Sequence, residues 1–261
     1  MRITHSVIKI RSLIQLVFLL LAVAFFIGII YWGLPYTIHH ICPYAIVCFG
    51  VSNRFVKTVF ALTIAFSFLI LVLSIFYGRI FCGWICPLGT IQELLFMLNY
   101  KKKKRRKQIP LYLERHFAKF KYIVLALTVI LSLLGFNYLF IHSCPIFALS
   151  ILPSIAISGL IVVLVILVGG IFWERFWCRF LCPYAALLNL FQMLSKMLHL
   201  PRLMMHRNLE RCNDCGICSQ NCPMNINLTQ TEFVDNPNCI LCFRCAQKCP
   251  KPDTIRWEKE Q

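Results

Sequence analysis

The sequence FCGWICPLGT at residues 81–90 returns, in slightly changed form, as WCRFLCPYAA at residues 177–186. Each copy holds two cysteines separated by three residues, has a proline directly after the second cysteine, and follows a long apolar run. A motif that recurs in the same place relative to an apolar run indicates an internal duplication. Parallel repeats of this kind occur in membrane proteins whose functional site lies between the two halves.

The composition predicts a membrane protein. Of the 261 residues, 59% are hydrophobic and only 14% are charged, with a mean hydropathy of +0.72, whereas a soluble domain has about 25% charged residues. Residues 12–53, 58–78 and 122–173 contain no Asp, Glu, Lys or Arg. Because one membrane helix needs about 20 residues, we expect four transmembrane helices, near residues 12–34, 57–77, 121–140 and 155–173.

The basic residues predict the orientation of these helices. Residues 1–11, 58–121 and 174–261 hold 3, 11 and 11 Lys and Arg, against 2 in residues 12–57 and none in residues 122–173. Basic loops stay in the cytoplasm, so we expect a multi-pass protein of the inner (cytoplasmic) membrane with both termini cytoplasmic. A cleaved signal peptide competes at the N-terminus, but the apolar run at 13–30 is long for one.

The run KKKKRRK at residues 101–107 is the densest basic cluster. Nucleic acid binding is one interpretation of such a run. Its place between two predicted spans favours a loop that faces anionic lipid headgroups. We therefore expect membrane lipid, and no nucleic acid, as its partner.

Eight cysteines near the C-terminus form two runs of the pattern C-x2-C-x2-C-x3-C-P. This is the bacterial ferredoxin pattern for two [4Fe–4S] clusters, in which the fourth cysteine of each run ligates the other cluster. A zinc site is the competing interpretation, but zinc needs neither the third cysteine nor the repeated C-x3-C-P. The expected ligands are Cys212, Cys215, Cys218 and Cys249 for one cluster, and Cys239, Cys242, Cys245 and Cys222 for the other.

These patterns predict an all-α membrane fold of two repeated helical hairpins, followed by a small α+β ferredoxin-like domain. The expected boundaries are a first hairpin at residues 1–100, a basic cytoplasmic loop at 101–120, a second hairpin at 121–200 and a ferredoxin domain at 201–261.

Four cysteines of the repeated motif fall at the cytoplasmic ends of the second and fourth predicted spans: Cys82, Cys86, Cys178 and Cys182. Residues four apart on a helix share a side, so each pair is expected to point at the other. Three interpretations stay open. The cysteines hold a further metal or iron–sulfur centre, or act as redox thiols activated by Arg79 and Arg175, or are small residues that allow close helix packing.

Other residues give weaker signals. Cys42 and Cys144 each precede a proline at the opposite face, Cys48 has no counterpart, and His39, His40 and His142 lie near these cysteines. Because no histidine falls in the middle of a predicted span, we expect no membrane haem. Glu93 and Glu174 are the acidic residues nearest the cytoplasmic boundary, and Glu174 is the candidate proton acceptor for a quinol.

Two C-x3-C-P motifs after alternate membrane helices, followed by two ferredoxin runs, resemble the NapH-type family of bacterial membrane polyferredoxins, which is related to NosR-type and CcoG-type proteins. The resemblance covers nearly the whole chain and the twelve cysteines of the four motifs. It implies a quinol dehydrogenase component that relays electrons from the quinone pool to a partner, either ferredoxin-like or a c-type cytochrome. The alternatives are a CcoG-like copper reductase or assembly factor, and a redox-sensing or anchoring membrane protein.

Overall fold

The computed structural model describes residues 2–32, 44, 47, 59–103, 109–136, 144–145, 157–229 and 231–259. The first half of the membrane part contains α1 (Arg2–Trp32), α3 (Val59–Tyr77), α4 (Ile80–Trp84) and α5 (Pro87–Lys103). The second half contains α6 (Leu111–Phe117), α7 (Phe120–Leu133), α10 (Ile157–Phe172), α11 (Phe176–Phe180) and α12 (Pro183–Met197). The tail contains β1 (Leu203–Arg207), α13 (Ile217–Gln220), α14 (Arg244–Lys248) and β2 (Ile255–Lys259). Cys42, Cys48, His39, His40 and His142 lie outside the described residues.

Among the described residues, two segments are long and apolar enough to cross a membrane, Ser6–Gly28 and Leu111–Leu133. Two further apolar helices are shorter in the described part of the chain, Ile64–Tyr77 and Ile157–Phe172. All four lie where spans are expected from the sequence. Their apolar side chains are turned outward, as with Leu13, Phe68, Ile123 and Leu164, each at least half exposed. Exposed apolar faces of this size favour contact with lipid.

The internal duplication is visible in the backbone. The short helices α4 and α11 occupy the same position in the two copies of the motif, and α5 and α12 both begin at the motif proline. The same turn closes each copy, because the amide of Cys86 donates to Phe81 O at 3.0 Å and that of Cys182 donates to Trp177 O at 2.9 Å. The expected repeat is therefore present at the level of single hydrogen bonds.

One detail of the motif differs from expectation. The two cysteines of each pair do not share the face of one helix, because α4 ends at Trp84 and α5 begins at Pro87. Proline has no amide hydrogen to donate and favours the first position of a helix. It therefore starts a new helix directly after Cys86, and the same happens after Cys182.

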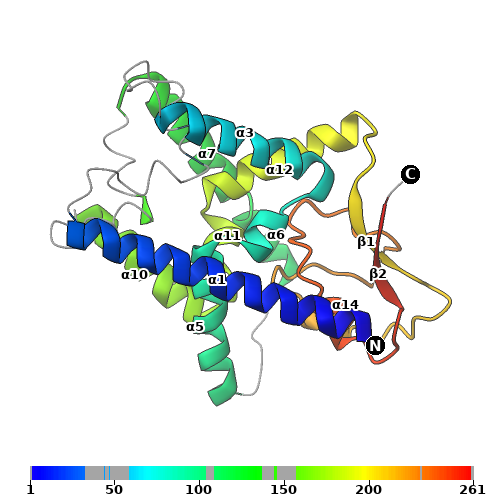
Figure 1. Cartoon of the computed structure of the whole chain (residues 1–261). Helices are drawn as coiled ribbons and strands as arrows, with labels where there is room; N and C mark the ends of the chain where they lie inside the picture. The colour runs from blue at the N-terminus through cyan, green and yellow to red at the C-terminus, as the bar shows by residue number, and fades with distance from the viewer. Residues whose placement is uncertain are drawn as a thin grey trace.

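The two repeats pack crosswise. Helix α5 of the first copy packs on α10 of the second, and α12 of the second copy packs on α3 of the first. The longer helices complete the pattern, since α1 packs on α5 and α7 packs on α12. Figure 1 shows α3 beside α12 and α1 crossing in front of α5 and α10. Both motif turns are thereby brought to the centre of the molecule.

The tail has the expected α+β character. Strands β1 and β2 pair antiparallel, from Leu203 opposite Lys259 to Arg207 opposite Ile255. Helices α13 and α14 pack on each other, and each carries the third cysteine of its run. Figure 1 shows the two strands at one side of the molecule, with α14 close to the N-terminal end of α1.

The tail docks directly on the first motif. Trp84 Nε1 donates to Leu241 O at 2.9 Å, and the Trp84 ring meets Phe243 edge to face. A Cβ at Gly83 would lie only 2.2 Å from Ile240 O. Glycine is therefore required at position 83, because any side chain would collide with the backbone of the tail.

Replacing Gly83 with alanine should separate the tail from the motif or shift both backbones. Overpacking of this kind costs about 1–3 kcal/mol. The matched control is Gly28→Ala, where a new Cβ meets nothing within 4 Å. Limited proteolysis of the purified protein should release the tail faster from Gly83→Ala than from Gly28→Ala, and equal release rates would contradict this docking.

Candidate functional site

The four cysteines of the repeated motif converge. Cys82 and Cys178 are buried, and Cys86 and Cys182 are half-buried. The pKa of Cys182 is raised first by burial and then by the charges of Cys178, Cys82 and Cys86. Burial, followed by Cys178 and Cys82, likewise raises the pKa of Cys86 to about 12. The two pairs therefore form one electrostatic group at the centre of the fold, here called the cysteine quartet.

Arginines tie the two motifs together reciprocally. Arg79 of the first repeat donates from Nη2 to Cys178 O of the second at 3.0 Å, and Arg175 of the second donates from Nη1 to Cys82 O of the first. Both arginines are fully buried. The two arginine contacts are equivalent in the two repeats. They place a guanidinium beside each half of the quartet.

Gln92 adds a direct contact with a quartet sulfur. Its Nε2 lies 3.8 Å from Cys178 Sγ, and its Oε1 accepts from the Trp177 amide at 2.9 Å. Gln92 comes from α5 of the first repeat and both partners come from the second. Hydrogen bonds to sulfur ligands are one of the means by which a protein tunes an iron–sulfur centre.

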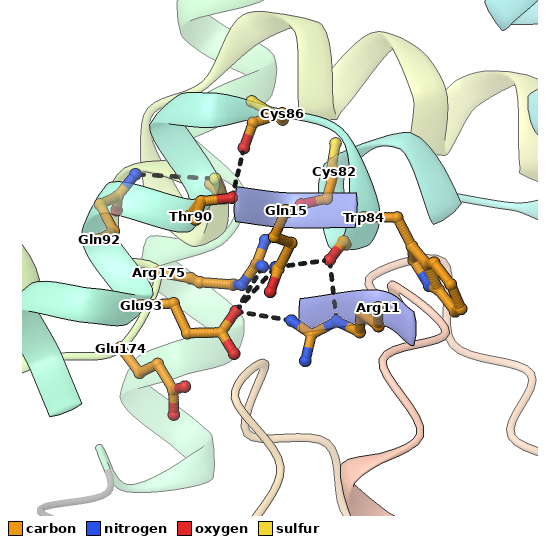
Figure 2. A network of polar contacts seen from close by, with 12 residues as sticks. Arg11, Gln15, Cys82, Trp84, Cys86, Thr90, Gln92, Glu93, Glu174 and Arg175 are labelled. Carbon is orange, nitrogen blue, oxygen red and sulfur yellow. Dashed lines mark hydrogen bonds and ion pairs between the residues drawn. The ribbon is translucent and has the colours of Figure 1, made fainter. Parts of the chain in front are cut away.

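Glu93 is the centre of a buried ion network (Figure 2). Its Oε2 accepts from Arg11 Nη2 at 2.6 Å and from Arg175 Nη2 at 2.7 Å. Its Oε1 accepts from Arg244 Nη2 at 2.5 Å. Burial alone would raise the pKa of Glu93, but Arg175, Arg11 and Arg244 together hold it far below its usual range. One carboxylate thereby joins α1, the second motif and the ferredoxin tail.

Two side chains of α1 also bind the backbone of the first motif. Arg11 Nε and Gln15 Nε2 each donate to Gly83 O at 3.0 Å. Figure 2 shows both side chains reaching from α1 toward the turn that carries Cys82. The N-terminal helix is therefore a structural partner of the quartet.

Glu174, the candidate proton acceptor, lies in the same network. It is buried, and its Oε1 accepts from Arg244 Nη1. This contact places Glu174 between the second motif and the tail. Its proposed part in proton transfer stays a prediction.

A second polar group lies on the other side of the quartet. Asn238 Oδ1 accepts from Arg79 Nη1 at 3.1 Å and from Lys121 Nζ at 2.5 Å, and the Asn189 amide lies 3.0 Å away. Lys121 is buried, and its charge acts on Cys82, Cys178 and Cys182. In the part of the chain that the structure describes, neither Arg79 nor Lys121 has a carboxylate partner.

The protein therefore leaves positive charge uncompensated around the quartet. Two buried carboxylates, Glu93 and Glu174, face four buried guanidiniums: those of Arg11, Arg79, Arg175 and Arg244. Burying unpaired charge is strongly unfavourable. An anionic group in this layer would balance the excess.

One predicted ferredoxin site is formed as a cavity. Its lining includes the four cysteines assigned to one cluster, Cys222, Cys239, Cys242 and Cys245. The rest of the lining is apolar: Met205, Pro223, Met224, Ile226, Leu228, Val234, Ile240 and Phe243. The arrangement brings Cys222 of the first run to three cysteines of the second, as the ferredoxin pattern predicts. We call this the inner site.

The inner site lies next to the quartet. The charges of Arg175 and Arg244 interact with Cys242, and that of Arg79 interacts with Cys239. The arginines that hold the motifs together therefore also act on the inner site.

The other predicted site, the outer site, is more accessible. Cys215 is exposed, and Cys212 accepts a hydrogen bond from Arg207 Nη1 at 3.3 Å. Cys218 is buried and interacts with Cys212. The assignment of Cys249 to this site stays a prediction from the spacing.

The two ferredoxin loops share an unusual backbone. Asp214 (φ 49°) and Gly216 (φ 70°) flank Cys215, and Leu241 (φ 46°) and Phe243 (φ 58°) flank Cys242. Left-handed φ values are unfavourable for residues other than glycine and persist where the surroundings impose them. Backbone of this kind turns successive amides toward an anion, as at many iron–sulfur sites. Both loops are thus shaped around a negatively charged group.

In the described residues, no three His, Cys, Asp or Glu side chains are arranged to hold a single metal ion. A cubane cluster takes one thiolate on each of its four irons, so its ligands need not meet at one point.

Several residues of the site were not expected from the sequence. Arg11, Lys121, Arg244 and Asn238 each contact the layer around the quartet or its network. A signal was available for two of them, because Arg11 and Lys121 stand at the ends of long uncharged runs. Charged residues close to a membrane span are often functional.

Replacing Glu93 with glutamine should strongly destabilise the protein, because three buried guanidiniums would lose their shared carboxylate. Removing one partner of a buried ion pair costs about 3–5 kcal/mol. The control Glu232→Gln alters an exposed pair with His206 and should cost at most about 1 kcal/mol. Thermal unfolding in detergent measures both, and a Glu93→Gln midpoint equal to that of the control would contradict the central place of Glu93.

Comparisons with known proteins agree with this geometry. A family described as "4Fe-4S binding domain" matches residues 59–107 and 155–201, which contain the two repeated motifs. A family described as "4Fe-4S dicluster domain" matches residues 204–250, which contain the two ferredoxin runs. No solved structure matches the chain.

Individual relatives support the same assignment, although the match spans little more than half of some of them. The uncharacterized protein MJ0750 of Methanocaldococcus jannaschii is 34% identical over 206 residues, which cover 78% of this chain and 82% of the relative. The putative electron transport protein YccM of Escherichia coli is 29% identical over 199 residues, covering 73% of this chain but only 54% of YccM. The ferredoxin-type protein NapH of Escherichia coli is 23% identical over 191 residues, covering 69% of this chain and 63% of NapH. The chain belongs to the NapH-type family of membrane polyferredoxins, whose members carry 4Fe–4S ferredoxin-type domains.

Proposed function

We propose that the protein is a quinol dehydrogenase component that relays electrons between the quinone pool and a partner redox protein. The observation that carries the proposal is the contact between its redox sites: Trp84 and Gly83 of the first motif touch Leu241 and Ile240, which lie between two cysteines of the inner site. Sites in such contact suit the passage of electrons from one to the next. The named relatives YccM and NapH, an electron transport protein and a ferredoxin-type protein, support this class of function.

The proposal includes four membrane spans with both termini in the cytoplasm. The exposed apolar faces of α3 and α10, together with the two longer apolar segments, support four spans. The basic residues of the N-terminus, the middle loop and the tail support the orientation.

The tail holds two [4Fe–4S] clusters in this proposal. The ligands at the inner site are Cys222, Cys239, Cys242 and Cys245, and those at the outer site are Cys212, Cys215, Cys218 and Cys249. The cavity lined by the first four cysteines and the paired left-handed loops support the assignment. When bound, such clusters accept and donate single electrons.

A third cluster is proposed at the quartet of Cys82, Cys86, Cys178 and Cys182. An oxidised cubane with four thiolates carries a double negative charge, so clusters at the quartet and the inner site compensate the excess of buried cations around them. Neutral thiols or a disulfide bring no negative charge, so the inner cluster alone would then offset the excess. The guanidiniums of Arg79 and Arg175 beside the quartet favour an anionic centre there, which supports the ligand role.

The residues of this chain then have distinct parts in the relay. Arg79 and Arg175 hold the two motifs at a fixed separation and favour the reduced, more negative state of the centres beside them. Gln92 donates toward the sulfur of Cys178. The exposed Cys215 marks the outer site as the place where a soluble or membrane-bound redox partner makes contact.

The metal content tests the third cluster. The anaerobically purified protein should contain about twelve irons and as many labile sulfides per chain, four for each cubane. The double variant Cys82→Ser/Cys178→Ser should keep about eight, because the tail clusters do not use these residues. A content of about eight in both proteins would rule out the third cluster.

Reduction by a quinol tests the relay. Menaquinol added to the protein in lipid nanodiscs should bleach the visible absorption of the clusters, and Cys222→Ser should lose the part due to the inner site. Reduction of copper ions by the protein, with no response to menaquinol, would instead support the metal reductase. If the protein reacts neither with menaquinol nor with copper ions, the result would support a redox-sensing or anchoring membrane protein.

A further inference from the structure

We propose that a quinol places one of its hydroxyl groups in a small pocket between the end of α3, α12, β1 and the loop at residues 234–241, with Gln192 as the hydrogen-bond donor to its oxygen. The inference rests on the proposed function and names the place where electrons from the quinol enter the protein. The pocket is lined by Ile75, Gly78, Gln192, Arg202, Leu203, Met204, Val234, Asp235, Asn236, Cys239 and Leu241.

The lining combines the two properties that a quinol needs. Apolar side chains such as Ile75, Leu203 and Val234 suit the faces of the ring, and Gln192, Asp235 and Asn236 provide polar atoms at the edge. Ligand sites are commonly apolar with a few placed polar groups.

The side-chain amide of Gln192 has a hydrogen-bond donor without an acceptor. Its side chain is 8% exposed, and its Nε2 has no hydrogen-bond partner. A buried donor left unpaired costs about 1–3 kcal/mol, which a quinol oxygen would recover. Gly78 keeps the space beside this amide open, since a Cβ there would lie 3.3 Å from Nε2.

The pocket belongs to one half of the duplication. When the two repeats are aligned so that Cys82 matches Cys178, Gln192 corresponds to Phe96. Phe96 is buried and apolar, so the first repeat has a ring where the second has an amide. A polar residue that breaks the symmetry of a repeat at a buried position indicates a role other than packing.

Lipid reaches the neighbourhood of the pocket. Phe76 and Tyr77 at the end of α3, and Met193 and Met197 on α12, are exposed apolar side chains. A lipid-soluble ring can therefore approach along this surface, whereas a hydrophilic donor has no such path from the bilayer.

Cys239 connects the pocket to the relay, because it lines both this pocket and the inner site. Oxidation of a hydroquinone to a quinone releases two electrons and two protons. The cluster that Cys239 and its fellow ligands would hold, together with an adjacent cluster, would supply the two one-electron acceptors that this oxidation needs. The protons leave toward water past Asp235, which is 30% exposed and bound to Lys196 at the surface and to Arg202 Nη1 at 3.0 Å.

The test uses the full chain with its clusters, in nanodiscs. Gln192→Met keeps the length of the side chain but removes the donor, and Ile75→Phe fills the pocket. The control Leu190→Met introduces the same residue on the exposed face of the same helix. The probes are menadiol, with cluster bleaching as readout, and an azido-quinone, with the labelled peptide identified by mass spectrometry. Dithionite reduction and iron content verify that each variant carries its clusters.

We expect the menadiol concentration for half-maximal bleaching to rise about tenfold in Gln192→Met, as for one lost hydrogen bond, and not to change in Leu190→Met. The azido-quinone should label the peptide around residues 192–205 in the wild type, and Ile75→Phe should abolish the label. Equal bleaching in all variants, with labelling elsewhere, would overturn the pocket and leave the quinol relay standing. A wild type that menadiol does not reduce would overturn both.

Discussion

The carboxylate of Glu93 is the contact on which the arrangement of the redox sites depends. It binds Arg11 of the N-terminal helix, Arg175 of the second motif and Arg244 of the ferredoxin tail, and is itself carried by the helix that follows the first motif. Four segments far apart in the sequence are therefore fixed by a single side chain. In a buried site such a network is specific rather than merely stabilising, because each partner would be left unpaired in any other arrangement.

If the proposed clusters are bound, the same layer couples their binding to folding. Glu93 and Glu174 cannot neutralise the buried cations that surround them, and Arg79 and Lys121 are bound only to neutral oxygens in the described residues. In the proposed relay, anionic clusters at the quartet and the inner site would supply the missing charge. In this account the binding of iron and sulfide, the docking of the tail and the closing of the two repeats are one process, as in other domains that fold around a metal.

Much of this could be predicted from the sequence, because spacing and periodicity are local. The repeated motif, the apolar segments and the ferredoxin runs can each be recognised within a window of about 20 residues. The shared helix face expected for Cys82 and Cys86 from their spacing is wrong, because α4 already ends at Trp84 and α5 begins at Pro87. The partners of Glu93 were also missed. Arg11 lies 82 positions away and Arg244 lies 151 positions away, and no local pattern links residues across such distances.

The central claim is that the buried excess of positive charge is balanced by a cluster at the quartet as well as by those in the tail. A reductive titration of the purified protein under anaerobic conditions tests it most directly, with the electrons taken up per chain as the measured quantity. The account predicts uptake of about three electrons, one for each cluster. Uptake of about two, with all visible cluster absorption bleached, would contradict it.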